Sequence, residues 1–189
     1  AHSVADVIAM AKANPGKINF GTGGVGTTPH MTAELFQYDA GIRMAHVAYR
    51  GEAGAINDLL AGQIPLMFAN LSAVMGHIKG GSLRALAVTG AQRSPSVPDV
   101  PTVAEAALPG FQSETWFGIV APAATPHDIR VKLNAAARQA MARDDTRQRL
   151  AELGMTNGTS SPEELDAYIK AEVIKWSKLI QEANVQALD

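Results

Sequence analysis

The stretch that decides the fold is Gly21-Thr22-Gly23-Gly24-Val25-Gly26-Thr27-Thr28-Pro29, a glycine-rich loop between two regular patterns. Ile18 to Phe20 before it predict a short strand, and Met31 to Tyr38 after it predict a helix. Thr28 suits the N-cap of that helix, and Pro29 suits its first position, where the missing amide hydrogen costs nothing. A strand, a glycine loop and a helix in this order predict an α/β unit with exposed backbone amides at the loop.

The predicted helix after the loop carries no acidic residue before Glu34. Four other expected helix starts have a carboxylate in the first turn, where orphan amides and the helix dipole favour negative charge. They are Ser3 with Asp6, Thr102 with Glu105, Thr125-Pro126 with Asp128, and Ser161-Pro162 with Glu163 and Glu164. The vacant slot at Thr28 therefore predicts a site for an external anion. Loop amides together with the hydroxyls of Thr22, Thr27 and Thr28 would suit a carboxylate.

A second helix start without an acid supports the same interpretation. Phe68-Ala69-Asn70-Leu71-Ser72 ends a strand pattern and opens a helix whose first turn is neutral. Asn70 either caps this helix only, or also turns its amide toward the same cleft as the loop. Ligands of open α/β sheets bind outside the carboxyl ends of the strands, where both helix starts would lie.

The remaining chain alternates strand and helix patterns as far as a proline-rich loop over 93–101, and is mainly helical near its end. Further strands are expected at 44–49, 65–68, 83–88 and 115–120, and further helices at 4–13, 52–60, 71–78, 103–108, 126–142, 145–153 and 162–183. This alternation predicts a parallel or mixed sheet covered by helices on both faces.

Composition narrows the class of protein. With 189 residues the chain can form one sizeable domain or two small lobes, and its net charge of −2 argues against a nucleic-acid partner. The absence of cysteine excludes disulfides, thiol nucleophiles and cysteine zinc sites, and is compatible with an oxidising compartment. A chain that begins at Ala1-His2, directly before a helix cap, is expected to be a processed protein or a piece of a longer one.

The main alternative is a nucleotide site, because Gly21-x-Gly23-x-x-Gly26 matches the dinucleotide-binding fingerprint. In that motif the helix begins near the second glycine, so Pro29 would fall inside it at a cost of about 3 kcal/mol. The acid expected farther along for the ribose hydroxyls is replaced by His46, Tyr49 and Arg50. Arg50 could serve an NADP-type site, so an NAD(P)-binding enzyme remains the alternative, beside a plain connector with a Thr-Pro cap.

Catalytic signals are lacking. His30, His46, His77 and His127 do not have metal-ligand spacing, and no Gly-x-Ser-x-Gly elbow is present. His30 is the one histidine in the anion-facing turn, where it could add a donor. The sequence therefore predicts a binding protein with no catalytic residue, metal or cofactor, rather than an enzyme.

Several stretches, in this order, resemble the Bug family, the periplasmic solute receptors of tripartite tricarboxylate transporters. They are 9–17, 21–30, 47–51, 62–68, 81–89, 99–105 and 116–118, which extend over essentially the whole chain. The resemblance implies a type II periplasmic-binding-protein (Venus-flytrap) fold that binds a small di- or tricarboxylate and performs no chemistry. It also implies a periplasmic location and the membrane subunits of a transporter as partners.

The resemblance places the carboxylate site at the glycine loop, with Tyr49 to Gly51 and Asn70 lining the same wall. The expected ligand-binding residues are Thr22, Gly23, Gly24, Gly26, Thr27, Thr28, Tyr49, Gly51 and Asn70. Residues 1–113 would form the second domain of the receptor, with a central mixed sheet flanked by helices. Residues 114–189 would be an α-rich segment that completes the first domain, whose N-terminal part has no counterpart here. Apolar surface on this segment predicts self-association.

Overall fold

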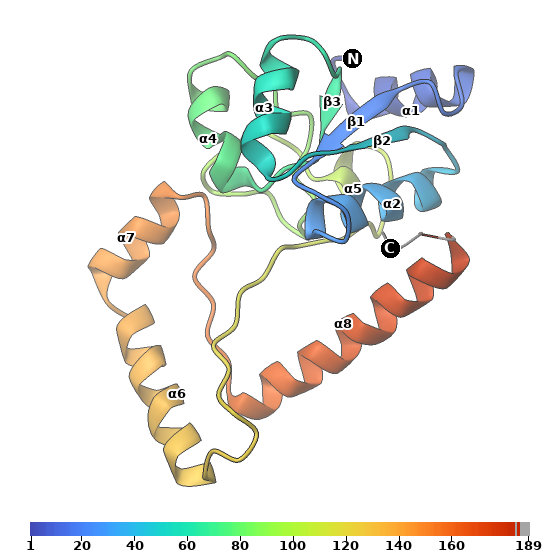
Figure 1. Cartoon of the computed structure of the whole chain (residues 1–189). Helices are drawn as coiled ribbons and strands as arrows, with labels where there is room; N and C mark the ends of the chain where they lie inside the picture. The colour runs from blue at the N-terminus through green and yellow to red at the C-terminus, as the bar shows by residue number, and fades with distance from the viewer. Residues whose placement is uncertain (184, 186–189) are drawn as a thin grey trace.

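The computed structural model describes residues 1–183 and 185. It shows an α/β unit formed by the first part of the chain and three helices that extend away from it (Figure 1). The elements in chain order are α1 (Val4–Ala13), β1 (Asn19–Thr22), α2 (Thr28–Ala40), β2 (Ala45–Ala48), α3 (Glu52–Leu60), β3 (Leu66–Met67), α4 (Leu71–Lys79), α5 (Val103–Ala106), α6 (His127–Met141), α7 (Asp144–Glu152) and α8 (Pro162–Glu182). Among the described residues, no helix is both long and apolar enough to cross a bilayer.

The sheet has the order β2-β1-β3, and both pairings are parallel. Phe20 in the central strand pairs with His46 on one side and with Leu66 on the other. Successive side chains of a strand point to opposite faces, so Phe20 and Gly21 face different layers. The core on the Phe20 side joins α1, α2 and α5, and its buried members are Val4, Val7, Ala11, Phe20, Ala33, Phe36, Ala40, Ile42, Met44, Val103 and Phe111.

The face that Gly21 presents is covered by α3. A methyl group added at Gly21 would collide with the Ile64 side chain and lie 3.5 Å from Ala55 Cβ. The side chains of Ile64 and Ala55 can therefore pack directly on the central strand because residue 21 lacks a side chain. At Gly23 an added Cβ would lie 2.9 Å from Glu52 Cγ and 3.2 Å from Glu52 N, so the start of α3 lies beside the glycine loop.

Helix starts follow the sequence pattern with two corrections. The capping boxes at Ser3, Thr102 and Ser161 are confirmed. The N-cap of α2 is Thr27, one residue earlier than predicted, because Thr27 keeps an extended backbone while Thr28 and Pro29 enter the first turn. The N-cap of α6 is Pro126, which has no side-chain cap, so Thr125 does not fill that role.

Two predicted strands are absent from the described sheet, which is parallel rather than mixed. In the 83–88 stretch only Val88 pairs, through an isolated parallel bridge to Thr102. The 115–120 stretch is extended but has no strand beside it within the described residues. A β pattern needs a neighbouring strand to form its ladder, and sequence alone does not say whether that neighbour lies in the same chain segment.

The last three helices, α6, α7 and α8, form a helical arm that touches the α/β unit near both of its ends (Figure 1). The Ser96 hydroxyl donates to the carbonyl of Ala151, and Tyr38 donates to Glu182 at 2.9 Å. No residue of α6 or α7 is buried, and Leu179 is the buried residue of α8. The arm therefore has almost no core of its own.

Candidate functional site

The glycine loop lies where the carboxyl ends of the three strands meet. The amides of Tyr49, Gly51 and Phe68 donate to the carbonyls of Thr22, Gly23 and Gly21, at 3.2, 2.9 and 3.1 Å. These bonds bring together the loop after β1, the turn after β2 and the segment after β3. The structure thus gathers the predicted site segments at one edge of the sheet, where open α/β sheets bind ligands.

The loop holds its shape through internal hydrogen bonds. Gly24 has φ of 143°, a conformation that side-chain-bearing residues rarely adopt. Its amide donates to Thr22 Oγ1 at 3.3 Å, and its carbonyl accepts from Thr27 Oγ1 at 2.7 Å. The amide of Gly26 donates to His30 Nδ1 at 3.1 Å. The amides of Gly24 and Gly26 therefore maintain the loop rather than remain free for a ligand.

Other amides of the loop lack a protein acceptor. Within the described part of the chain, no hydrogen bond is made by the amides of Val25, Thr27 or Thr28. The first turn of α2 contains no acid, as predicted. Unpaired amides at the positive end of a helix dipole form a site for a negative group. Val25 was not among the predicted residues, because an amide donor gives no signal in the side-chain sequence.

The rings of Phe20, His46 and His30 form a stack that packs against the glycine loop. The His46 ring stacks on Phe20 with centroids 5.0 Å apart, and His30 stacks on His46 at 4.2 Å. His46 Nε2 lies 2.7 Å from the hydroxyl of Thr22, which is fully buried. The Thr22 hydroxyl therefore holds the loop from inside instead of pointing to its outer side. Sequence reasoning missed His46, since its place depends on the Phe20–His46 strand register.

Both imidazoles are held neutral by their surroundings. Burial lowers the pKa of His30 below its ordinary value. Burial, and then the proximity of His30, lower the pKa of His46 from 6.5 to about 4. The nearest acid is Glu34, whose Oε1 lies 3.6 Å from His30 Nε2 and whose own pKa is raised by burial. The stack therefore carries no charge at neutral pH.

The depressed pKa of His46 predicts a stability that falls on acidification. Between pH 6.5 and about 4, His46 binds a proton in the unfolded chain but stays unprotonated in the folded chain. The contribution is fully present above pH 6.5 and is lost as the pH falls toward about 4. With a reduction for solvent screening of this partly exposed ring, the loss is on the order of 2 kcal/mol. Urea unfolding of the wild type and His46→Asn should show a flatter pH profile for the variant. Parallel profiles would contradict this account.

Asn70 is engaged by an acid from another helix. Its backbone amide and its Nδ2 donate to Glu52 Oε1 at 2.7 and 3.2 Å, and its Oδ1 accepts from the Thr115 hydroxyl at 2.8 Å. The start of α4 is therefore occupied by the chain's own carboxylate, unlike the start of α2. The sequence does not show this pairing, because Glu52 opens α3 and is far from Asn70 along the chain.

The Tyr49 hydroxyl also has a partner inside the protein. It donates to Asp58 Oδ2 at 2.7 Å, and this bond raises the pKa of Tyr49. The ring lies against Gly54 and Gly21, beneath the loop. Gly51 is the N-cap of α3 with φ of 100°, and its amide is bonded to Gly23. Tyr49 and Gly51 thus contact the glycine loop through backbone bonds and packing.

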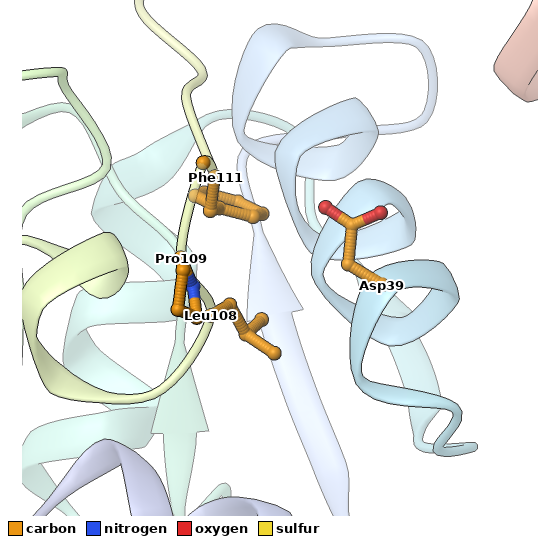
Figure 2. A pocket seen from close by; sticks show the side chains of 5 residues that line it. Asp39, Leu108, Pro109 and Phe111 are labelled. Carbon is orange, nitrogen blue, oxygen red and sulfur yellow. The ribbon is translucent and has the colours of Figure 1, made fainter.

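One hollow of the surface lies away from the loop. A volume of about 470 Å³ is lined by Asp39 and by residues 108–111, beside the C-terminal end of α2 (Figure 2). Figure 2 shows the Asp39 carboxylate facing the coil that carries Leu108, Pro109 and Phe111. The Asp39 carboxylate would repel a carboxylate ligand, and its apolar neighbours have no side-chain donor for one. The loop amides are therefore the better candidate for an anion site.

Comparison with known proteins identifies the family. A family model described as "tripartite tricarboxylate transporter family receptor" matches residues 1–185. The chain belongs to this receptor family. It is 38% identical over 185 residues to a protein of the tcbD–tcbE intergenic region of Pseudomonas sp. strain P51, covering 97% of this chain and 55% of that protein. It is 33% identical to BugT of Bordetella pertussis, covering 95% of this chain and 55% of BugT.

Solved structures of receptors share the fold. An R. palustris protein with adipate superposes with a TM-score of 0.89 at 34% identity, covering 100% of this chain and 63% of that one. MatC from Rhodopseudomonas palustris with bound malate superposes with a TM-score of 0.76 at 27% identity, covering 94% of this chain and 62% of MatC. The predicted α/β periplasmic-binding-protein fold and the Bug resemblance are confirmed. This family member spans only about half the length of the two curated relatives, the Pseudomonas protein and BugT, 55% of each.

The nucleotide alternative gains no support. The family is one of receptors, and α2 begins at Thr28 with Thr27 as its N-cap, well after Gly23. In a dinucleotide site the helix would begin near that second glycine, with its dipole directed at the pyrophosphate. The sequence of this chain therefore matches the dinucleotide-binding fingerprint, but its helix begins too late for the geometry of a dinucleotide site.

Proposed function

We propose that this chain is part of an extracytoplasmic receptor that captures a small di- or tricarboxylate for a tripartite tricarboxylate-type transporter. Its partners are then that carboxylate and the membrane subunits of the transporter, and its location is the periplasm. The observation that carries the proposal is the start of α2, where the first turn has no acid and the amides of Val25, Thr27 and Thr28 have no acceptor within the described residues.

Energetics support a carboxylate at this loop. Each charge-assisted hydrogen bond contributes about 1.5–3 kcal/mol when it is made out of water. Two or three such bonds at Thr27, Thr28 and Val25 would together contribute about 3–9 kcal/mol, compared with about 8.2 kcal/mol for a micromolar complex. Contacts to the rest of the ligand would have to supply the difference and the cost of association. The adipate and malate in the two structurally similar receptors are dicarboxylates, which fits the same donor chemistry.

The proposed binding residues fall into two groups. Thr27 and Thr28 would contact the carboxylate through their amides. Gly23, Gly24, Gly26, Tyr49 and Gly51 would form the wall, with Thr22 fixing the loop and Asn70 held at the rim by Glu52. A ligand in this position would be enclosed on one side only by the segments that the structure describes.

The domain division is also a proposal. Residues 1–113 would be the ligand-binding domain, and residues 114–189 would complete the other domain of a full-length receptor. Large apolar side chains are exposed along the second part, notably Phe117, Ile119 and Val120 at 76%, 81% and 79%. Relatives have additional chain beyond the matched part, which could cover such a surface.

The same surface is expected to bind a second copy when the chain is alone. Replacing Phe117 and Ile119 by serine should weaken the dimer by more than about tenfold, because each buried side chain contributes about 1.5–3 kcal/mol. Light scattering over a concentration series measures the change, with Lys132→Ser on exposed α6 as the control. A wild-type chain that stays monomeric and binds no apolar dye would refute the proposal.

A thermal-shift panel tests the function. A ligand at about 100 times its dissociation constant should stabilise the fold by about 2.7 kcal/mol. Succinate, malate, adipate and citrate should include at least one stabiliser, whereas NAD and NADP should give no shift. Stabilisation by NAD(P) with no response to any carboxylate would replace the receptor by a nucleotide-binding protein.

A further inference from the structure

The first turn of α2 differs from three other capped helices at its third residue, the N3 position. In α1, α5 and α8 this residue is Asp6, Glu105 or Glu164, and its carboxylate accepts the backbone amide of the N-cap residue. These acids stabilise the helix start and also neutralise it. In α2 the N3 residue is His30.

His30 makes an equivalent cap with an imidazole. Its backbone amide donates to Thr27 Oγ1 at 3.4 Å, while its Nδ1 accepts from the amide of Gly26 at 3.1 Å. The residue is 5% exposed and stacks on His46. A ring nitrogen that accepts a hydrogen bond has no proton, so the ring is neutral with its proton on Nε2.

We propose that His30 is a positioning residue of the carboxylate loop, a neutral cap that holds Gly26 without adding negative charge to the binding slot. The inference rests on the proposed function and adds a residue to it. A carboxylate at N3 would hold the same amide, but its charge would repel an incoming carboxylate at the adjacent amides. The imidazole supplies the acceptor and leaves the helix dipole available.

Burial favours the neutral form of the His30 ring. It faces His46 from β2 and Glu34 from its own helix, and His46 in turn lies on Phe20 of β1. Burial lowers the pKa of His30. Protonation would place a hydrogen on Nδ1 against the amide of Gly26, so the cap would open and the loop would loosen at acidic pH.

The first test needs no ligand. In the 189-residue chain, nitrogen NMR of the imidazoles at neutral pH should show His30 protonated at Nε2 and unprotonated at Nδ1. The amide of Gly26 should be protected from hydrogen exchange, should lose that protection in His30→Ala, and should keep most of it in His30→Gln, which retains an acceptor. A proton on Nδ1, or equal Gly26 exchange in wild type and His30→Ala, would overturn the cap.

The second test compares two variants of equal size that differ in charge. With adipate as the probe in calorimetry, at a temperature where circular dichroism shows both variants folded, His30→Gln should bind within about threefold of wild type, whereas His30→Glu should bind at least about tenfold more weakly. The wild-type affinity should fall on acidification, and that of His30→Gln should change less. Equal affinities for the Gln and Glu variants would overturn the charge argument.

The two proposals fail in different ways. A wild-type chain that binds no carboxylate at all would remove the proposed function, while the ring nitrogens and the Gly26 amide would still decide whether His30 caps the loop. A wild type that binds adipate with His30 protonated at Nδ1 would retain the function and reject the cap.

Discussion

Replacing Phe20 by alanine is expected to lower the free energy of unfolding by about 3–5 kcal/mol, the largest effect of any single truncation in the α/β unit. Phe20 is fully buried in the central strand. The centroid of its ring lies 5.0 Å from that of His46 and 5.8 Å from that of Phe68. Truncation of Phe20 therefore opens a cavity beside the His46 ring, which contacts the loop. Urea unfolding followed by circular dichroism measures the change.

Phe117→Ala is the matched control for Phe20→Ala, because the same atoms are removed from a side chain that is 76% exposed. Its unfolding free energy should stay within about 0.5 kcal/mol of wild type at dilute concentration. Equal losses for the two variants would show that the core does not centre on β1.

Replacing Gly24 by alanine is expected to abolish most carboxylate binding while leaving the chain folded. Gly24 has φ of 143°, and an added Cβ would lie 3.3 Å from the carbonyl oxygen of Tyr49. A strained residue of this kind costs about 1–3 kcal/mol, and the loop can avoid the cost by moving its amides. Calorimetry with adipate should then show an affinity loss of about tenfold or more, since each misplaced charge-assisted bond forfeits about 1.5–3 kcal/mol.

Gly16→Ala supplies the control for Gly24→Ala. Gly16 also has positive φ, at 72°, but an added Cβ there meets no atom within 4 Å. It should cost a comparable amount of stability, about 1–2 kcal/mol, without changing the affinity for adipate. If Gly24→Ala binds as well as Gly16→Ala, the loop conformation has no part in recognition.

Local signals in the sequence predicted the features that depend on neighbours in the chain. Ser3 with Asp6 and Ser161 with Glu164 formed the expected caps, because capping joins residues three apart. The acid-free start of α2 was correct for the same reason, although the N-cap shifted from Thr28 to Thr27. The helix-and-strand order up to Asn70 also followed from periodicity.

Features that depend on contacts between segments distant in the chain could not be predicted from the sequence. Glu52 reaches Asn70 from the start of α3, which packs against Gly23 of the loop. His46 contacts Thr22 and Phe20 because its strand pairs with β1 in one register. A shift of one residue in that register would have put His46 on the other face. The 115–120 stretch failed as a strand because strand formation requires a partner, which no propensity supplies.

The central claim is that the amides of Val25, Thr27 and Thr28, which have no acceptor among the described residues, receive the carboxylate. Amide chemical shifts of the isotope-labelled chain during an adipate titration test it most directly. The account predicts that the largest saturable shifts occur at Val25, Thr27 and Thr28, with smaller ones at Asn70, whose amide Glu52 already holds. Saturable shifts confined to Asn70 and the start of α4, or to the hollow at Asp39, would contradict it.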